Sequence, residues 1–412
     1  MLSPESKQQP AQTPGVKVFQ LLASLFAGLL VGVMFGVLVL VISGIVLGVF
    51  AVAFGAGESV LSIVLLLSGG VCLPTALIVA LIVGLIASVV IYRRRSHKNV
   101  QANRAFTITC LGTVAIGACL LGLVGVGNLI FPRVPAEERE ALVALYKSTN
   151  GDHWNNNRGW LSWWKSPCRW NGVRCDGDSP TAHIIRLYLQ ENQISGSIPL
   201  ELGQLSNLKQ LYLFDNQLSG SIPPELDNIF TLEEMLLMNN RLTGPIPPEL
   251  AKLSNLRSLY LFNNQLGGDI PTELGSLSAL ESLLLSDNQL AGSIPPELSR
   301  LTNLEKLDLN GNQLTGPIPP ELGRLGNLWY LYLNENQLTG ALPSELGALS
   351  TLYHLYLDHN PLDGSLPLEL GDLAKMSQFH FGDTDLCEPD DAAFQEWLAG
   401  IRELERTGVL CP

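Results

Sequence analysis

From residue 184 to residue 371, apolar and polar positions recur with a period of 24 residues. Each unit holds two leucines separated by one residue, as in Leu211 and Leu213, with an asparagine three positions after the second leucine. The asparagines stand at Asn192, Asn216, Asn240, Asn264, Asn288, Asn312, Asn336 and Asn360. The alternating leucines predict a short strand with one buried face. A fixed period of this length predicts a solenoid of stacked coils.

The other positions of the unit predict the rest of each coil. Gly220 permits a turn away from the strand, and the Ile-Pro-Pro that follows predicts an extended run leading into a short helical turn. An asparagine side chain has a donor and an acceptor, so it can bond the buried turns of successive coils. A recurring glutamate, Glu225 in this unit, is expected near the N-terminus of the helical turn, where its charge is favourable. A cation-binding ridge of these glutamates is the alternative.

Segments on both sides of the repeats predict caps that cover the terminal coils. Residues 133–183 form the expected N-terminal cap, with a helix over 135–146 that is apolar on one face. Five tryptophans follow this helix, and we interpret them as cap core, with a ligand cage as the alternative; they are Trp154, Trp160, Trp163, Trp164 and Trp170. The repeats are expected over 184–384, including a ninth strand with phenylalanines at the leucine positions. Residues 385–412 form the expected C-terminal cap, with a helix over 389–398.

Four cysteines lie only at the two ends of the repeats: Cys168, Cys175, Cys387 and Cys411. This placement predicts one disulfide in each cap and therefore an oxidising compartment. A zinc site would need four converging ligands, but the two pairs belong to opposite ends of the solenoid. We expect neither a structural metal nor a cofactor.

Three uncharged apolar runs precede the repeats, at about 18–54, 60–92 and 105–131. Each exceeds the roughly 20 residues that cross a hydrocarbon core, so 18–131 is predicted to be an all-α transmembrane region. Residues 1–17 are expected to form a disordered cytoplasmic tail, and splitting the first run would give four spans. The basic loop 93–104 should face the cytoplasm, which places the repeats outside. We predict a multi-pass protein of the plasma membrane with an extracellular repeat domain.

The charge of the chain also changes after residue 132, where the apolar runs have ended. The whole chain has a net charge of −13, and residues 1–132 contribute about +5, so the remainder contributes about −18. Phosphates require a basic surface, so this acidic domain argues against nucleic acid as a partner.

The segments Asn150-Gly-Asp-His-Trp154 and Cys168-x-Trp-x-Gly-Val-x-Cys175 resemble the N-terminal cap of plant-type extracellular leucine-rich-repeat proteins. The 24-residue unit is similar to the repeats of plant receptor kinases and polygalacturonase inhibitors, and the resemblance covers 135–371. It implies an α/β solenoid whose curved, parallel, concave sheet binds peptides or proteins. The predicted spans precede the repeats instead of following them, and no kinase domain is expected. The ectodomain has no Asn-x-Ser/Thr sequon, which favours a bacterial or otherwise non-glycosylated source.

The outward-facing strand positions are more aromatic and aliphatic than solubility favours, which predicts an interaction surface. We call two groups of candidate ligand-binding residues the N-terminal patch and the C-terminal patch. The N-terminal patch is Tyr188, Tyr212, Phe214, Met238, Tyr260 and Phe262. The C-terminal patch is Trp329, Tyr330, Tyr332, Tyr353, His354, Tyr356 and Asp358, with His359 and His380 beside it. Such residues anchor peptide or protein ligands and can stack on sugars; tyrosine pairing between strands is the alternative.

No motif of a known catalytic site appears in the sequence. Only His354, Asp358, His359 and His380 could approach one another, and on an open sheet they should be solvated, unlike a catalytic group. A transition-metal site there is the alternative. We predict a non-enzymatic, receptor-like or adhesive recognition protein that acts through a partner in the membrane. A membrane-tethered inhibitor or scaffold for an extracellular enzyme is the second hypothesis.

Overall fold

The computed structural model describes residues 134–162, 165–177 and 181–412. The predicted tail, the three predicted spans and the basic loop lie outside the described residues, as do Trp163 and Trp164. Among the helices that are described, none is both long and apolar enough to cross a membrane.

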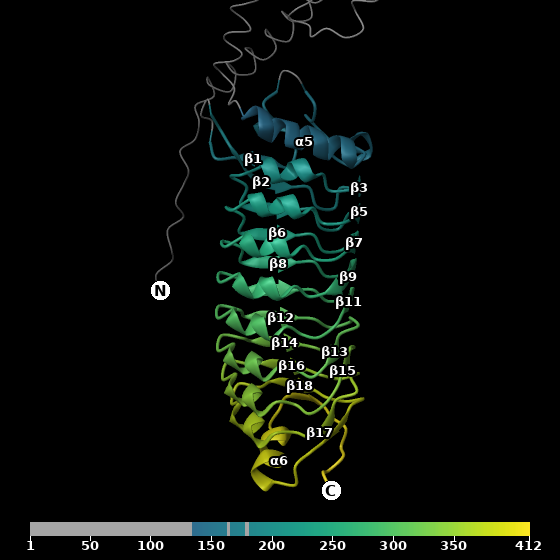
Figure 1. Ribbon diagram of the computed structural model, residues 1–412, viewed down its shortest axis with the longest axis vertical. Coiled ribbons are helices and arrows are strands. Elements are labelled where there is room, and N and C mark those ends of the chain that lie inside the picture. The colour runs from purple at the N-terminus through teal and green to yellow at the C-terminus, as the bar shows by residue number, and fades with distance from the viewer. Residues whose placement is uncertain (1–133, 163–164, 178–180) are drawn as a thin grey trace, which may run out of the picture. The chain divides into compact units, whose positions relative to one another are not determined.

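One large sheet runs through all the coils, which stack in sequence order (Figure 1). Its first strand is antiparallel to the second, and the following strands are all parallel. In order, the strands are β1 (Val173–Cys175), β2 (Ile184–Tyr188), β4 (Gln210–Tyr212), β6 (Glu234–Leu236), β8 (Ser258–Tyr260), β10 (Ser282–Leu284), β12 (Lys306–Asp308), β14 (Tyr330–Tyr332), β16 (His354–Tyr356), β18 (Gln378–His380) and β20 (Glu403–Glu405). From β2 to β18, the register pairs each residue with its counterpart 24 residues later, as with Tyr188 and Tyr212.

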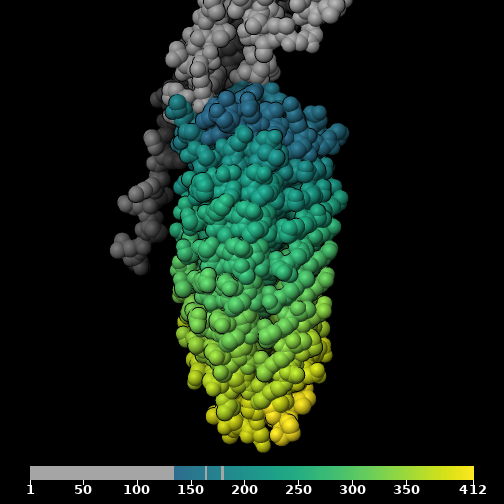
Figure 2. Space-filling model, in the orientation of Figure 1, coloured from purple at the N-terminus to yellow at the C-terminus, as the bar shows by residue number. Residues whose placement is uncertain are grey.

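The core is a column of leucines inside the coils. Leu211 and Leu213, the alternating pair of one unit, are both fully buried, and so are their counterparts in the other repeats. Each fully buried leucine stabilises the fold by about 1.5–3 kcal/mol relative to exposure. Because the buried leucines of each coil pack against those of the next coil, the core is continuous along the repeats. In the space-filling view the coils are consecutive bands of colour, closed against one another (Figure 2).

A short 3-10 helix follows the extended Ile-Pro or Leu-Pro run of each repeat, as the prolines predict. These helices are η3 (Leu200–Gln204), η4 (Pro224–Asn228), η5 (Pro248–Lys252), η6 (Thr272–Ser276), η7 (Pro296–Arg300), η8 (Pro320–Arg324), η9 (Ser344–Ala348) and η10 (Leu368–Asp372). The recurring glutamate lies in the first turn of each, Glu225 in η4 for example.

Each coil also contributes a second strand, which the sequence patterns did not predict. These strands are β3 (Ser195–Gly196), β5 (Gln217–Gly220), β7 (Arg241–Gly244), β9 (Gln265–Asp269), β11 (Gln289–Ala291), β13 (Thr315–Gly316), β15 (Gln337–Leu338), β17 (Asp363–Ser365) and β19 (Asp385–Cys387). The first five form one parallel sheet, and the last four form two pairs.

The regularly spaced asparagines form a ladder of hydrogen bonds, which confirms the expectation from the sequence. Asn288 Nδ2 donates to the carbonyl oxygens of Leu261 and Leu285, both at 3.1 Å. Its Oδ1 accepts from the Leu266 backbone N–H at 3.0 Å. Each ladder side chain therefore joins the turns of two successive coils.

The N-terminal cap consists of helix α5 (Ala136–Ser148), the 3-10 helices η1 (Gly151–His153) and η2 (Pro167–Arg169), and strand β1. Trp154, Trp160 and Trp170 are at most 6% exposed and pack on one another, so they are core residues as expected. The disulfide between Cys168 and Cys175 closes the loop that holds η2.

The C-terminal cap contains helix α6 (Ala392–Ala399), the disulfide between Cys387 and Cys411, and β20. Phe394 and Leu398 of α6 are buried, as the sequence predicts. The strand β20 was not predicted. It continues the large sheet beyond β18, with Leu404 paired to Phe379, because α6 returns the chain to the open edge.

Candidate ligand-binding face

From β4 to β18, each strand of the large sheet buries its central residue and presents the residues on either side, except that β10 also buries Ser282. In β14, for example, Leu331 is fully buried, while Tyr330 and Tyr332 are half-buried on the outer face. Because the strands are in register, equivalent outward residues form columns that cross the coils. One column, which we call the tyrosine column, is Tyr188, Tyr212, Leu236, Tyr260, Leu284, Asp308, Tyr332, Tyr356 and His380.

Rings of the N-terminal patch touch one another where tyrosines occupy adjacent coils. The ring centroids of Tyr188 and Tyr212 lie 4.8 Å apart, and Phe214 lies 6.1 Å from Tyr212. Burial raises the pKa of the Tyr212 hydroxyl, and its hydrogen bond to Glu234 acts in the same direction. Met238, Tyr260 and Phe262 continue the half-buried face in the next two coils.

A polar segment separates the two patches. Asp308 lies at its centre and accepts hydrogen bonds from Ser286 Oγ at 3.0 Å and from Asn310 Nδ2 at 2.8 Å. Burial raises the pKa of the Asp308 carboxyl, although these hydrogen bonds oppose the change. Ser282 and Ser286 are only 7% and 4% exposed, so these two side chains of the polar segment are shielded from solvent.

The C-terminal patch is a continuous stack of rings. Tyr332 and Tyr356 stack at 4.6 Å, and His380 stacks on Tyr356 at 4.2 Å with the planes 8° apart. Beside them, His354 packs edge-on to Tyr330 at 4.7 Å. The edge of the patch is open to solvent.

Trp329 and Tyr353 form that open edge. Each is 41% exposed, and their ring centroids lie 6.5 Å apart. Exposed aromatic side chains next to a stacked, half-buried group are typical of ligand anchors. They lose little conformational freedom on binding, because neighbouring rings already restrict them in the free protein.

Four tyrosine hydroxyls make hydrogen bonds at a constant sequence spacing, which the sequence analysis did not predict. Each bonds the outward residue 22 positions later, on the neighbouring strand. The pairs are Tyr188 with Gln210, Tyr212 with Glu234, Tyr332 with His354 and Tyr356 with Gln378. The signal was present in the sequence, since a polar residue stands 22 positions after each of these tyrosines. Burial lowers the pKa of His354, so its neutral ring is suited to accept from Tyr332, at 2.8 Å.

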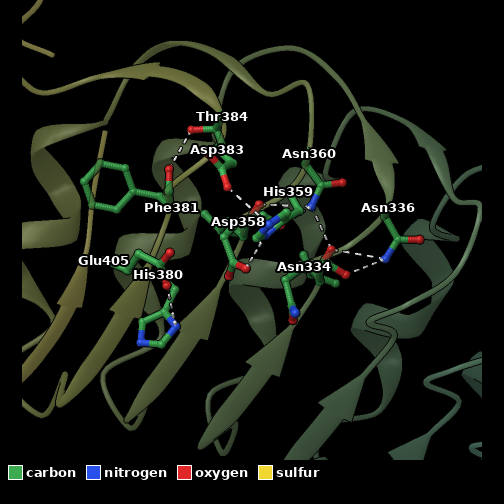
Figure 3. A network of polar contacts seen from close by, with 12 residues as sticks. Asn334, Asn336, Asp358, His359, Asn360, His380, Phe381, Asp383, Thr384 and Glu405 are labelled. Carbon is green, nitrogen blue, oxygen red and sulfur yellow. Dashed lines mark hydrogen bonds and ion pairs between the residues drawn. The ribbon is translucent and has the colours of Figure 1, made fainter. Parts of the chain in front are cut away.

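Asp358 corrects the expectation that the polar group beside this patch is solvated. It is only 7% exposed, and its Oδ2 lies 2.9 Å from His359 Nδ1 (Figure 3). That hydrogen bond raises the pKa of His359, whose Nε2 also lies 3.2 Å from Asp383. The carboxylate is buried because the coils on either side and the neighbouring imidazole cover it.

Of the four residues considered as a cluster, Asp358 and His359 contact each other, but the four do not converge on one site. His354 bonds a tyrosine and His359 bonds Asp358, while His380 lies 3.7 Å from Glu403 and 3.6 Å from Glu405. Within the described ranges, no group of three or more His, Cys, Asp or Glu could hold a metal ion. A shallow depression of about 460 Å³ lies beside His359 and was not foreseen; it is lined by His359, Asn360, Pro361, Asp383, Thr384 and Asp385.

Comparison with known protein families assigns the architecture. The leucine rich repeat N-terminal domain matches residues 135–176. The leucine rich repeat matches residues 183–205, 207–229, 231–253, 255–277, 327–349 and 351–373, and a two-copy leucine rich repeat model matches 278–320. The described part of the chain is therefore a plant-type leucine-rich-repeat solenoid with its N-terminal domain, a parallel sheet and disulfides.

Solved structures similar to this chain include plant receptor-kinase ectodomains. The ectodomain of the Arabidopsis thaliana receptor kinase GASSHO1/SCHENGEN3, in complex with CASPARIAN STRIP INTEGRITY FACTOR 2, is 37% identical over 61% of this chain and 30% of that chain, with a TM-score of 0.56. The Arabidopsis HAESA ectodomain, in complex with an IDA peptide hormone ligand, is 30% identical over 66% of this chain and 45% of that chain, with a TM-score of 0.54.

A plant ice-binding protein is also similar, 27% identical over 68% of this chain and 96% of that chain, with a TM-score of 0.53. The chain spans less than half of the length of the two receptor ectodomains. Among curated protein sequences, none matches this chain.

Proposed function

We propose that this protein is a receptor-like recognition protein whose large-sheet face binds a peptide or protein ligand. The observation that carries the proposal is the C-terminal patch. There, rings of successive coils stack on one another, and the exposed side chains of Trp329 and Tyr353 form the edge of the patch. Pairing between strands accounts for buried tyrosine contacts, but it does not require an exposed tryptophan. The complex of the similar HAESA ectodomain with an IDA peptide hormone ligand supports the same ligand class. Sugars are a further ligand class for such rings.

Alanine substitution of aromatic anchors tests this proposal. We expect Trp329→Ala with Tyr356→Ala to weaken binding of a selected peptide by about 30-fold or more, because truncating a buried aromatic anchor costs at least about 2 kcal/mol of binding energy. Tyr212→Ala with Phe262→Ala tests the N-terminal patch in the same way. Peptides would be selected from a random display library on the full-length chain, and affinities measured by calorimetry.

Phe230 provides the control, since it is an exposed aromatic residue, 54% accessible, that follows η4 and lies off the large sheet. Phe230→Ala should leave affinity unchanged. Unaltered affinity in both double variants would refute the proposal for this face. Capture of an extracellular hydrolase that loses its activity on binding would instead support the inhibitor hypothesis.

We further propose that the protein is anchored in the plasma membrane by 18–131, with the repeats outside the cell and a signalling partner in the membrane. The apolar runs and the basic loop 93–104 support this topology. The two disulfides support an oxidising compartment for the caps.

Epitope tags test the topology. A tag after Pro412 should be stained by antibody on intact cells, because the repeats follow the third span. A tag within the loop 93–104 should be stained only after permeabilisation, because basic loops stay in the cytoplasm. Staining of the loop tag on intact cells would contradict the proposal.

A further inference from the structure

Two side-chain oxygens, one in the C-terminal patch and one beside it, lie buried without a hydrogen-bond donor. They are Asp358 Oδ1 and Asn334 Oδ1. Both residues stand two positions after a tyrosine of the stack and 24 residues apart, so they occupy equivalent places in successive coils about 5 Å apart. A buried acceptor without a donor is unfavourable, because it has lost water and gained no partner. The pair is therefore suited to a donor that comes from outside the chain.

The surrounding contacts hold these acceptors in place. In Figure 3 the side chains of Asn334, Asp358 and His380 project from successive coils toward the same side. The Asp358 carbonyl oxygen accepts from the backbone N–H of Glu335 at 3.0 Å and from Asn360 Nδ2 at 3.3 Å. Since His359 occupies only Oδ2 of the carboxylate, Oδ1 remains for a further donor.

The charge around the site favours a cation, since His359 contacts both Asp358 and Asp383, and His380 lies near both Glu403 and Glu405, so carboxylates outnumber imidazoles. Asp358 is a carboxylate that is more than nine-tenths buried. Burial raises the pKa of the Tyr356 hydroxyl, and the charges of Glu403 and Asp358 act in the same direction. Asp308 contributes a second half-buried carboxyl in the tyrosine column.

We propose that this site binds a basic side chain of the ligand, with arginine the best fit. A guanidinium is planar and carries five N–H donors, so it can donate to both acceptors while its apolar stem lies along the outer edges of the Tyr332–Tyr356 stack. The same face already holds one cation beside an aromatic ring, since Lys306 Nζ lies 5.6 Å from the ring centroid of Tyr330. The inference rests on the proposed function, because it names the chemistry of a ligand for the same face.

Citrulline provides a matched test, since it has the shape of arginine without the charge. Peptides selected on the full-length chain should contain arginine or lysine. Replacing the arginine of one such peptide with citrulline should weaken its binding to the wild type by about tenfold or more. In Asp358→Asn, the arginine and citrulline peptides should bind almost equally, because the charged acceptor is gone.

Asp363→Asn is the matched control, since it removes one carboxylate from an exposed position in β17. It should preserve the preference for arginine. Asn334→Leu removes the second acceptor without changing charge and should also reduce the preference. This variant keeps the test decisive if Asp358→Asn does not fold.

Failure of this inference is distinguishable from failure of the proposed function. If Trp329→Ala with Tyr356→Ala abolishes binding but the citrulline peptide binds as well as the arginine peptide, the peptide site stands and the basic-residue site is wrong. Selected peptides without arginine or lysine also overturn the inference. A selection that returns no binding peptide overturns both.

Discussion

Replacing Asn288 with alanine is expected to lower the free energy of unfolding by about 3 kcal/mol. The substitution leaves the Leu266 N–H and the carbonyl oxygens of Leu261 and Leu285 without their side-chain partner. A buried polar group without a partner costs about 1–3 kcal/mol, and here several are affected together. Urea unfolding followed by circular dichroism measures the change.

The adjacent Gln289 gives the control for this prediction. Its side chain is exposed in β11, so Gln289→Ala should change the free energy of unfolding by less than about 0.5 kcal/mol. Equal effects of the two substitutions would show that the asparagine ladder does not stabilise the coils.

Replacing Glu138 with alanine is expected to destabilise the N-terminal cap by about 3 kcal/mol. Glu138 is 2% exposed, and its Oε2 accepts from the Ile184 N–H at 2.8 Å. Its Oε1 lies 2.6 Å from His183 Nδ1. This one carboxylate therefore connects α5 to the first parallel strand, and its loss leaves buried partners unpaired. Tryptophan fluorescence measures the change, because Trp154 and Trp170 lie in this cap.

Glu137 in the same helical turn is exposed and is the control for the cap prediction. Glu137→Ala should leave the fluorescence transition unchanged. If Glu138→Ala melts together with wild type, the cap is held by its apolar core and disulfide alone.

Much of the fold follows from local pattern. The spacing of Leu211 and Leu213 predicted strands with one buried face, and both leucines are fully buried. The asparagine interval predicted hydrogen bonds between coils, which Asn288 makes. These predictions succeed because the period is free of insertions, so each residue meets its own counterpart in the next coil.

The details of the candidate site depend on neighbouring coils and were less predictable. Asp358 was expected to be solvated, but His359 and the adjacent coils bury it. The bond from Tyr356 to Gln378 joins two strands. Its spacing of 22 residues is present in the sequence, but the register of the strands was needed to show that the two side chains meet. The strand β20 was missed because Leu404 pairs with Phe379 only after α6 has turned the chain.

By itself, the sequence determined the repeat, the caps, the cysteine pairs and the aromatic columns, because each depends on spacing along a regular chain. The tertiary structure decided which polar atoms in those columns acquire partners and which remain buried without one. Burial and pairing arise from contacts between coils, and side-chain contacts across a sheet are absent from any single repeat. For that reason Tyr332 and Tyr356 could be assigned to the face from the sequence, whereas the unpartnered oxygen of Asp358 appeared only in the folded chain.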